Sequence, residues 1–169
     1  VTSLVTGDGS YSLAGFLQSD ADINGVSLIV FFNDGNPAND RDFVIFDGND
    51  SNIDNPYDAS GWNVLLSGIN YASGTASVVL HVGDGQQGGS WNDDNLYING
   101  NILASGPEIF NGQSVPNGAS AANLNGGLWD ILNFNITPFM TPGINNFALT
   151  TGVVGDCLGL IVAIVDLPA

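Results

Sequence analysis

The chain has 169 residues and is 44% hydrophobic, so we expect a single domain with a full core over residues 1–169. It has 17 acidic residues but only one basic residue, Arg41, which gives a formal net charge of −16. Nucleic acids and anionic membrane surfaces are bound through Lys and Arg, so this charge excludes both as partners.

Short apolar runs alternate with clusters of Gly, Asn and Asp along the whole chain, the pattern of a sandwich or barrel of β-strands. Lys is absent and Glu occurs once, so two good helix formers are lacking and no helix is expected. In chain order, strands are predicted at 1–5, 10–17, 26–32, 42–46, 62–69, 75–82, 95–98, 101–104, 128–136, 145–150 and 158–167.

Three details of this pattern predict local structure. Apolar residues alternate along 75–82, as in a strand with one face in the core. The runs 26–32 and 158–165 are almost entirely apolar, so we predict central strands that are either buried on both faces or have one face in the core and the other against a neighbour. Asn99-Gly100 lies between two short runs and predicts a type I′ hairpin turn.

Several short motifs follow one another: Val1-Thr2-Ser3-Leu4-Val5, Gly25-Val26-Ser27-Leu28, Arg41-Asp42-Phe43-Val44, Val82-Gly83-Asp84-Gly85, Leu96-Tyr97-Ile98-Asn99-Gly100, Trp129-Asp130 and Gly155-Asp156-Cys157-Leu158. In these motifs the chain resembles the domain-of-unknown-function 3344 family of prokaryotic surface proteins. The resemblance implies an antiparallel, jelly-roll-like β-sandwich and a secreted, extracellular or cell-surface location. It supplies no catalytic residues. Further strands would be expected before residue 1, which predicts a sheet that another chain completes.

Two Asp- and Asn-rich stretches form the best candidate metal site, because Ca²⁺ prefers carboxylate, amide and carbonyl oxygens on flexible loops. Neither stretch has the ligand spacing of an EF-hand, and Asp and Asn are also common turn residues. Calcium binding and turn formation are both compatible with the pattern. The candidate ligands are Asp34, Asn36, Asp40, Asp42, Asp47, Asp50 and Asp54.

A second candidate site combines Asp84 with Trp91, Asp93 and Asp94. An aromatic ring beside carboxylates could stack on a sugar and hydrogen-bond its hydroxyl groups, so glycans are possible ligands. The alternative is a Gly-rich turn in which Trp91 covers the edge of the core.

Catalysis is not predicted. His81 is the only histidine, and no nucleophile elbow, phosphate-binding loop or zinc-type cluster accompanies it. Cys157 is the only cysteine, and we expect it to be a small buried residue. Asn49 and Asn135 each begin a sequon for N-glycosylation, with Asn49 expected in a loop and Asn135 in a strand.

The predicted function is that of a structural subunit of an extracellular polymer, a pilus-like filament, sheath or surface layer built from copies of this chain. A terminal strand of one copy would complete a sheet of the next. The expected exchange segments contain Val1, Leu4 and Val5 at one end and Leu160, Val162 and Ile164 at the other. The alternative is an adhesin or carbohydrate-binding module that uses the Asp-rich loops, with or without Ca²⁺. No apolar run approaches the roughly 20 residues of a membrane helix, so membrane insertion is not expected.

Overall fold

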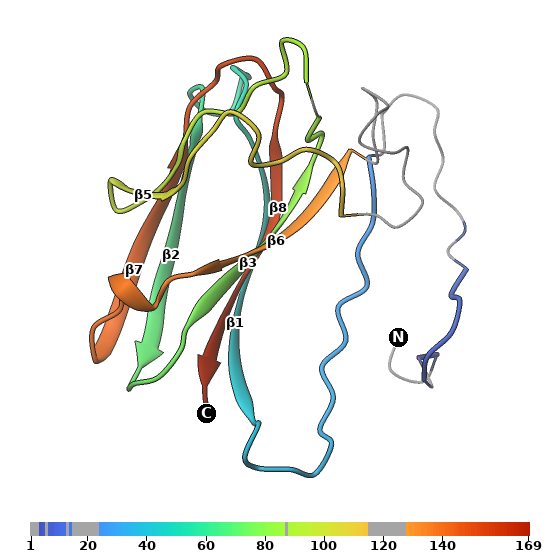
Figure 1. Ribbon diagram of the computed structural model, residues 1–169, viewed down its shortest axis with the longest axis vertical. Coiled ribbons are helices and arrows are strands. Elements are labelled where there is room, and N and C mark those ends of the chain that lie inside the picture. The colour runs from blue at the N-terminus through green and yellow to red at the C-terminus, as the bar shows by residue number, and fades with distance from the viewer. Residues whose placement is uncertain (1–3, 6, 13, 15–23, 87, 115–127) are drawn as a thin grey trace.

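The computed structural model describes residues 4–5, 7–12, 14, 24–86, 88–114 and 128–169. Within these residues, eight strands form two sheets that face each other (Figure 1). The strands are β1 (Arg41–Ser51), β2 (Trp62–Tyr71), β3 (Ser77–Gly83), β4 (Leu96–Ile98), β5 (Asn101–Ala104), β6 (Trp129–Asn135), β7 (Gly143–Thr151) and β8 (Gly159–Pro168), with a short 3-10 helix, η1 (Thr137–Phe139), after β6.

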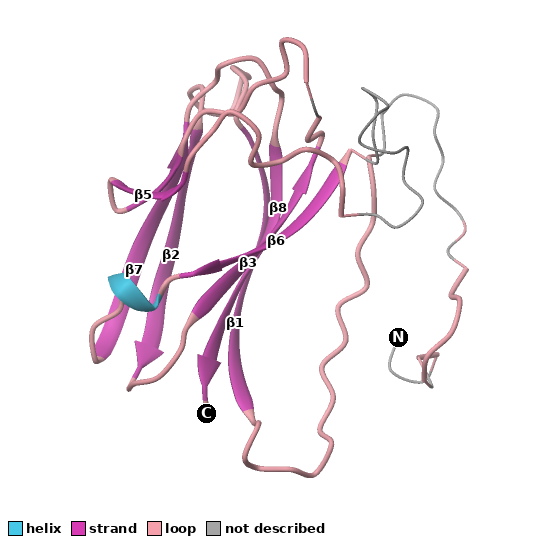
Figure 2. Ribbon diagram, viewed as in Figure 1, coloured by secondary structure: helices cyan, strands magenta, loops and turns pink. Residues whose placement is uncertain are grey.

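The strand order is that of a jelly roll. The first sheet, here called sheet A, has the order β1-β8-β3-β6, and sheet B has the order β2-β7-β4-β5. All six strand pairings are antiparallel. Successive strands therefore often cross from one sheet to the other, as in two interlocked Greek keys. The predicted all-β, jelly-roll-like sandwich is confirmed, and Figure 2 shows the loops gathered at the two ends of the strands.

The core lies between the two sheets. Side chains alternate along each strand, so every second residue points inward. Val78, Leu80 and Val82 of β3 are at most 1% exposed, and the predicted alternation of this strand is confirmed. At one end of the core the rings of Trp62 and Phe110 pack with their centroids 5.5 Å apart. Each fully buried side chain of this size contributes roughly 1.5–3 kcal/mol through removal from water.

Two local predictions are confirmed. The run 158–165 falls largely in β8, which pairs with β1 on one side and β3 on the other, so it is an interior strand. Asn99 and Gly100 join β4 to β5 with φ angles of 48° and 77°. A type I′ turn needs positive φ at both central residues, and Asn and Gly tolerate this best.

The predicted strand at 26–32 is wrong. The segment is extended, but it belongs to neither sheet, and several of its apolar side chains are exposed. Of the two earlier predicted strands, the described residues 4–5, 10–12 and 14 are not in strands, and the rest lie outside the described residues.

The prediction that one sheet lacks a strand is also wrong. Residues 41–168 alone supply four strands to each sheet, so a jelly roll is complete without any leading strand. The positions where another chain could pair are therefore the outer edges of the sheets, not a missing strand inside one.

Candidate functional site

Residues 24–32, here called the arm, form a strand-like segment without a partner strand. The arm contains no charged residue. Val26 and Leu28 are 55% and 48% exposed, and Phe32 is 84% exposed. No backbone–backbone hydrogen bond joins the arm to another described residue. In Figure 1 the arm runs past sheet A on the side away from sheet B. Apolar side chains, together with peptide groups that have no backbone partner among the described residues, are the properties of a segment that can add to a sheet.

Ser27 is the main anchor of the arm to sheet A. Its Oγ lies 2.8 Å from Nδ1 of His81 in β3 and accepts a hydrogen bond of 3.1 Å from Nε1 of Trp129 in β6. His81 and Trp129 are only 5% and 6% exposed. Burial lowers the pKa of His81, which favours its neutral form. His81 is thus a buried strand residue whose side chain is hydrogen-bonded to the arm.

Two close packing contacts support this anchor. A Cβ atom on Gly25 would lie 2.5 Å from the ring of Trp129, so only glycine lets the backbone approach so closely. At the other end of the arm, the rings of Phe31 and Phe43 of β1 have centroids 5.0 Å apart. The arm thus crosses the outer face of sheet A from β6 to β1, held by a small number of contacts.

The outer face of sheet A under and beside the arm is apolar. Ile164 of β8 is in register with Ile45 of β1 and with Val79 of β3. Ile164 is 7% exposed, whereas Ile45 is 46% exposed, so the cover over this face is incomplete. Exposed apolar surface of this kind is typical of an interaction surface.

The free edge of β6 is the edge of sheet A with a regular register. Its register with β3 runs without a shift from Ser77–Asn135 to Gly83–Trp129, and no other described strand pairs with it. Leu132 and Phe134 face the core but are only partly buried, unlike the corresponding side chains of β3. The core is therefore incompletely covered at this edge.

The other edge strands are interrupted. The pairing of β1 with β8 shifts between Asp47 and Asp50, and that of β2 with β7 shifts between Leu66 and Ile69. The pairing of β5 with β4 also shifts, and β5 spans only Asn101–Ala104. Bulges, charges and short length are common ways of protecting sheet edges from other chains. The edge of β6 has neither a bulge nor an exposed charge.

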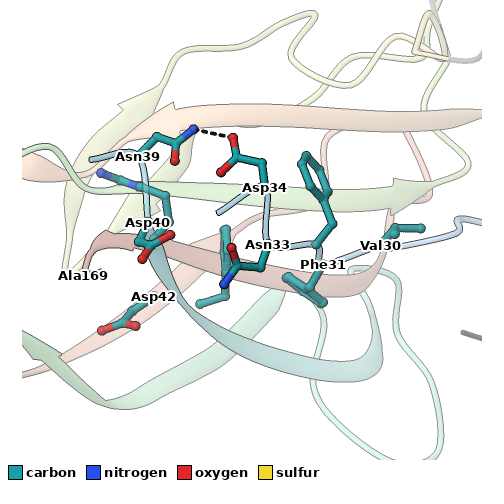
Figure 3. A pocket seen from close by; sticks show the side chains of 11 residues that line it. Val30, Phe31, Asn33, Asp34, Asn39, Asp40, Asp42 and Ala169 are labelled. Atoms are coloured by element: carbon teal, nitrogen blue, oxygen red, sulfur yellow. Dashed lines mark hydrogen bonds between the residues drawn. The ribbon is translucent and has the colours of Figure 1, made fainter. Parts of the chain in front are cut away.

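Three of the predicted calcium ligands line one cleft. The cleft, of about 680 Å³, lies between the arm and the start of β1, and Asp34, Asp40 and Asp42 surround it (Figure 3). Asp34 accepts hydrogen bonds from the Asn36 backbone at 2.9 Å and from Nδ2 of Asn39 at 3.0 Å. The bond from Asn39 and then that from Asn36 lower the pKa of Asp34. This is the geometry of an Asx turn.

The remaining predicted ligands lie elsewhere. Asp47 and Asp50 follow along β1, and Asp54 lies in the loop after it. Among the described residues, no group of three or more His, Cys, Asp or Glu side chains could hold a metal ion. Calcium binding stays a prediction that would depend on amide and carbonyl oxygens.

The second candidate site is divided between the surface and the interior. Trp91 is partly exposed, and Oδ1 of Asp94 accepts a hydrogen bond from the Asn95 backbone. Asp93, in contrast, is 6% exposed, and its Oδ2 accepts bonds of 2.7 Å from the backbones of Ile109 and Phe110. Burial raises the pKa of Asp93 to about 7. Asp93 therefore holds a loop in place and is not open to an external sugar.

Two further buried carboxylates share this role, which was not predicted from the sequence. Oδ2 of Asp130 accepts a bond of 2.8 Å from the Gly112 backbone. Oδ2 of Asp156 accepts a bond of 2.9 Å from the Gln86 backbone. Burial raises the pKa of both, that of Asp156 to about 6. Asp130 and Asp156 lie in the motifs Trp129-Asp130 and Gly155-Asp156-Cys157, near the starts of β6 and β8. An Asp close to a strand terminus was therefore the sequence signal for this role.

The predicted exchange segment in β8 needs correction. Leu160, Val162 and Ile164 lie in an interior strand that is paired on both sides, so they could be donated only if sheet A came apart. At the other end, Leu4 is 73% exposed and Val5 is partly buried, outside any strand, whereas Val1 lies outside the described residues.

The glycosylation candidates are both exposed strand residues. Asn49 is in β1 where the register shifts, and not in a loop as predicted. Asn135 is in β6 as predicted, and its Oδ1 accepts a bond of 3.0 Å from the Thr137 backbone. Cys157, expected to be buried, is a partly buried free cysteine.

Comparisons with protein families, curated proteins and solved structures found no match to this chain. Its class is therefore defined by its fold, an antiparallel jelly-roll β-sandwich. The resemblance to the domain-of-unknown-function 3344 family stays a prediction. The described part of the chain contains no helix of the length and hydrophobicity needed to cross a bilayer.

Proposed function

We propose that this chain is a structural subunit of an extracellular polymer, such as a pilus-like filament, sheath or surface layer, whose copies complete one another by β-strand addition. One observation carries the proposal. The same chain presents an apolar arm whose backbone makes no hydrogen bond to the other described residues and a sheet edge that no described strand covers.

Strand addition would give the arm a partner strand and would cover the free sheet edge at the same time. An added strand gains main-chain hydrogen bonds along its length, and its alternate side chains fill pockets at the edge of the core. The arm and the free edge are different parts of the chain, so the contact is of the head-to-tail kind. Such contacts form rings when the rotation closes and open filaments when it does not.

The charge distribution supports the choice of these surfaces. With a net charge of −16, two copies repel each other through most of their surfaces. The arm has no charged residue, and the exposed residues of β6 are Ile131, Asn133 and Asn135. Salt shortens the Debye length to about 8 Å at physiological ionic strength, so added salt should favour assembly.

The test is electron microscopy combined with size-exclusion chromatography of the purified chain at low and high salt, each with and without a calcium chelator. Regular filaments or sheets that increase with salt would support the polymer. A monomer under all four conditions would contradict it. Loss of assembly on chelation would show that Ca²⁺ takes part.

A second candidate function, a carbohydrate-binding module or adhesin, is favoured by the cleft of about 680 Å³ at the arm. Its lining combines the aromatic rings of Phe31 and Phe43 with Asn33 and Asp40, which suits stacking on a sugar and hydrogen bonding to its hydroxyls. Glycan-array binding that Phe43→Ala abolishes would support this function. Absence of binding to any glycan would contradict it.

We propose no catalytic role. The pair Ser27 and His81 has the atom types of a nucleophile and a base. However, His81 is 5% exposed, and within the described residues its side chain is hydrogen-bonded to Ser27 and to no carboxylate. The pair is better explained as an attachment of the arm.

A further inference from the structure

On the basis of the proposed function, we propose which surfaces meet: the arm of one copy adds to the free edge of β6 in a second copy. Val26, Leu28 and Val30 of the donor would face the core edge beside Leu132 and Phe134 of the acceptor. The proposal assigns the donor role to residues 24–32 and removes it from β8.

The choice of β6 follows from the comparison of edges. Strand addition needs a straight row of free peptide groups, and bulges disrupt such a row. The pairing of β6 with β3 is regular from end to end, whereas β1, β2 and β5 each show a register shift. Core-facing side chains are partly uncovered at both edges of sheet A, Leu132 and Phe134 in β6 and Val44 and Phe46 in β1, so the regular register decides in favour of β6.

The arm matches this edge in length and in pattern. The arm covers residues 24–32 and β6 covers Trp129–Asn135, so an extended arm at about 3.3 Å per residue spans the whole edge. Because side chains alternate, the exposed row that contains Val26, Leu28 and Val30 would enter the core edge together. Ser27 and Ile29 would then lie on the outer face of the sheet.

The net charge of the chain favours a second copy, and not a different protein, as the partner of the arm. A partner that carried basic groups would seek the acidic loops, but the arm and the exposed residues of β6 offer no charge to recognise. Two copies with net charge −16 repel each other elsewhere, so they can meet only through uncharged surfaces such as these. The arm and the edge are therefore mutually suitable and present on every copy.

Release of the arm from its own sheet would uncover His81 and Trp129, which contact Ser27 and are only 5% and 6% exposed, so strand addition to a neighbour must offset this cost. Within the described residues, its polar attachment to the sandwich is through Ser27, with ring packing at Gly25 and Phe31. The connection to β1, residues 33–40, is rich in Asn, Asp and Gly and reaches at most roughly 3.3–3.6 Å per residue. The arm's self-docked position and its proposed position on a neighbour are thus alternatives.

Cross-linking of mixed single-cysteine variants tests the contact directly. In a Cys157→Ser background, one variant carries Ile29→Cys and the other Asn133→Cys, because both positions would lie on the outer face of the extended sheet; Ile29 is partly buried and Asn133 is exposed. The two are mixed and treated with a short flexible bis-maleimide, which tolerates a small error in register. We expect a 29–133 heterodimer at several times the yield obtained when the acceptor is Asn70→Cys, an exposed Asn on the edge strand β2.

Charge substitution provides an independent test. The double variant Leu28→Asp and Val30→Asp changes side chains that are 48% exposed, so the sandwich should keep its fold, as checked by circular dichroism. In the Ile29→Cys background, we expect the yield of 29–133 cross-links and the assembled fraction to fall at least tenfold. The matched control, Ile144→Asp on β7 of sheet B, is 65% exposed and should leave both unchanged.

The two proposals can fail separately. Filaments that form without 29–133 cross-links and survive the double substitution would refute the assignment of arm and edge but leave the polymer standing. Cross-linked pairs in a sample without filaments would support the assignment and refute the polymer. A monomer with no cross-links would refute both. Filaments with specific cross-links, lost in the double variant, would support both.

Discussion

The arm and β8 make an instructive comparison, because the sequence presents them as equivalent apolar runs. Leu160 and Val165 of β8 are 4% and 0% exposed, whereas Val26 and Leu28 of the arm are about half exposed. β8 is hydrogen-bonded to strands on both sides, and the arm lies outside both sheets. An apolar run therefore indicates that a segment needs cover, but not whether its own chain or another chain provides it.

The largest expected difference between the two regions comes from removing one leucine side chain from each. Leu160→Ala in β8 should lower the free energy of unfolding by about 2–5 kcal/mol, because it opens a cavity in the core. Leu28→Ala should change it by no more than about 0.5 kcal/mol, as is usual at exposed sites. Urea unfolding followed by tryptophan fluorescence measures both. A large effect of Leu28→Ala would show that the arm belongs to the folding unit.

The stability of the sandwich and the docking of the arm should depend differently on pH. Burial raises the pKa of Asp93 well above its ordinary value, to about 7, so the folded state favours the protonated carboxyl. The stability from this preference is complete below about pH 4 and is lost as the pH rises to about 7, a change on the order of 2–4 kcal/mol. Unfolding in urea at pH 4.5 and 7.5 measures it. Asp93→Asn, which cannot ionise, should flatten the profile, and an unchanged slope would rule out Asp93 as its source.

The arm should respond to pH with the opposite sign. Burial lowers the pKa of His81, so the neutral imidazole is favoured where it meets Ser27. This contribution is present above the ordinary pKa of histidine and is lost as the pH falls through the lowered value. The indole NH signal of Trp129 in NMR spectra should therefore shift toward that of a released arm only at acidic pH.

The polar anchor at the start of β8 is expected to have an intermediate effect. Asn52 is 2% exposed, donates to the Asp156 carbonyl at 3.0 Å and accepts from the Leu158 backbone at 2.8 Å. Asn52→Ala leaves buried peptide groups without partners and should cost about 1–3 kcal/mol in urea unfolding. The matched control is Asn70→Ala, at an exposed position in β2. Equal effects would mean that the buried bonds add nothing.

The smallest effect is expected from the anchor of the arm. Ser27→Ala removes the bonds to His81 and Trp129 and should destabilise arm docking by about 0.5–1.5 kcal/mol, with little change in unfolding of the sandwich. The Trp129 indole NH signal reports this change, and the exposed Ser67→Ala in β2 is the control. If the arm assembles as proposed, its release should also raise the yield of 29–133 cross-links. An unchanged indole signal would contradict the anchoring role.

Much of the sandwich could be predicted from the sequence, because local pattern determines it. The alternation in β3 and the Asn99-Gly100 turn specify which side faces the core and where the chain reverses. The candidate sites could not be predicted in the same way. Asp93 reads as a surface ligand in sequence, and only the path of the loop through Ile109 and Phe110 turns its carboxylate inward. Which loops approach each other depends on contacts between distant parts of the chain.

Arg41 lies where the segment that follows the arm enters β1. This position affects the resistance of the chain to proteolysis. It is the only Lys or Arg in the chain, so a trypsin-type protease has a single possible cleavage site, and cleavage there would separate the arm from the sandwich. The guanidinium is held at 2.7 Å by Asp166 of β8 and donates to the Thr75 carbonyl, and the backbone of Arg41 is paired within sheet A. As long as β1 stays paired, the one bond whose cleavage would detach the arm is shielded.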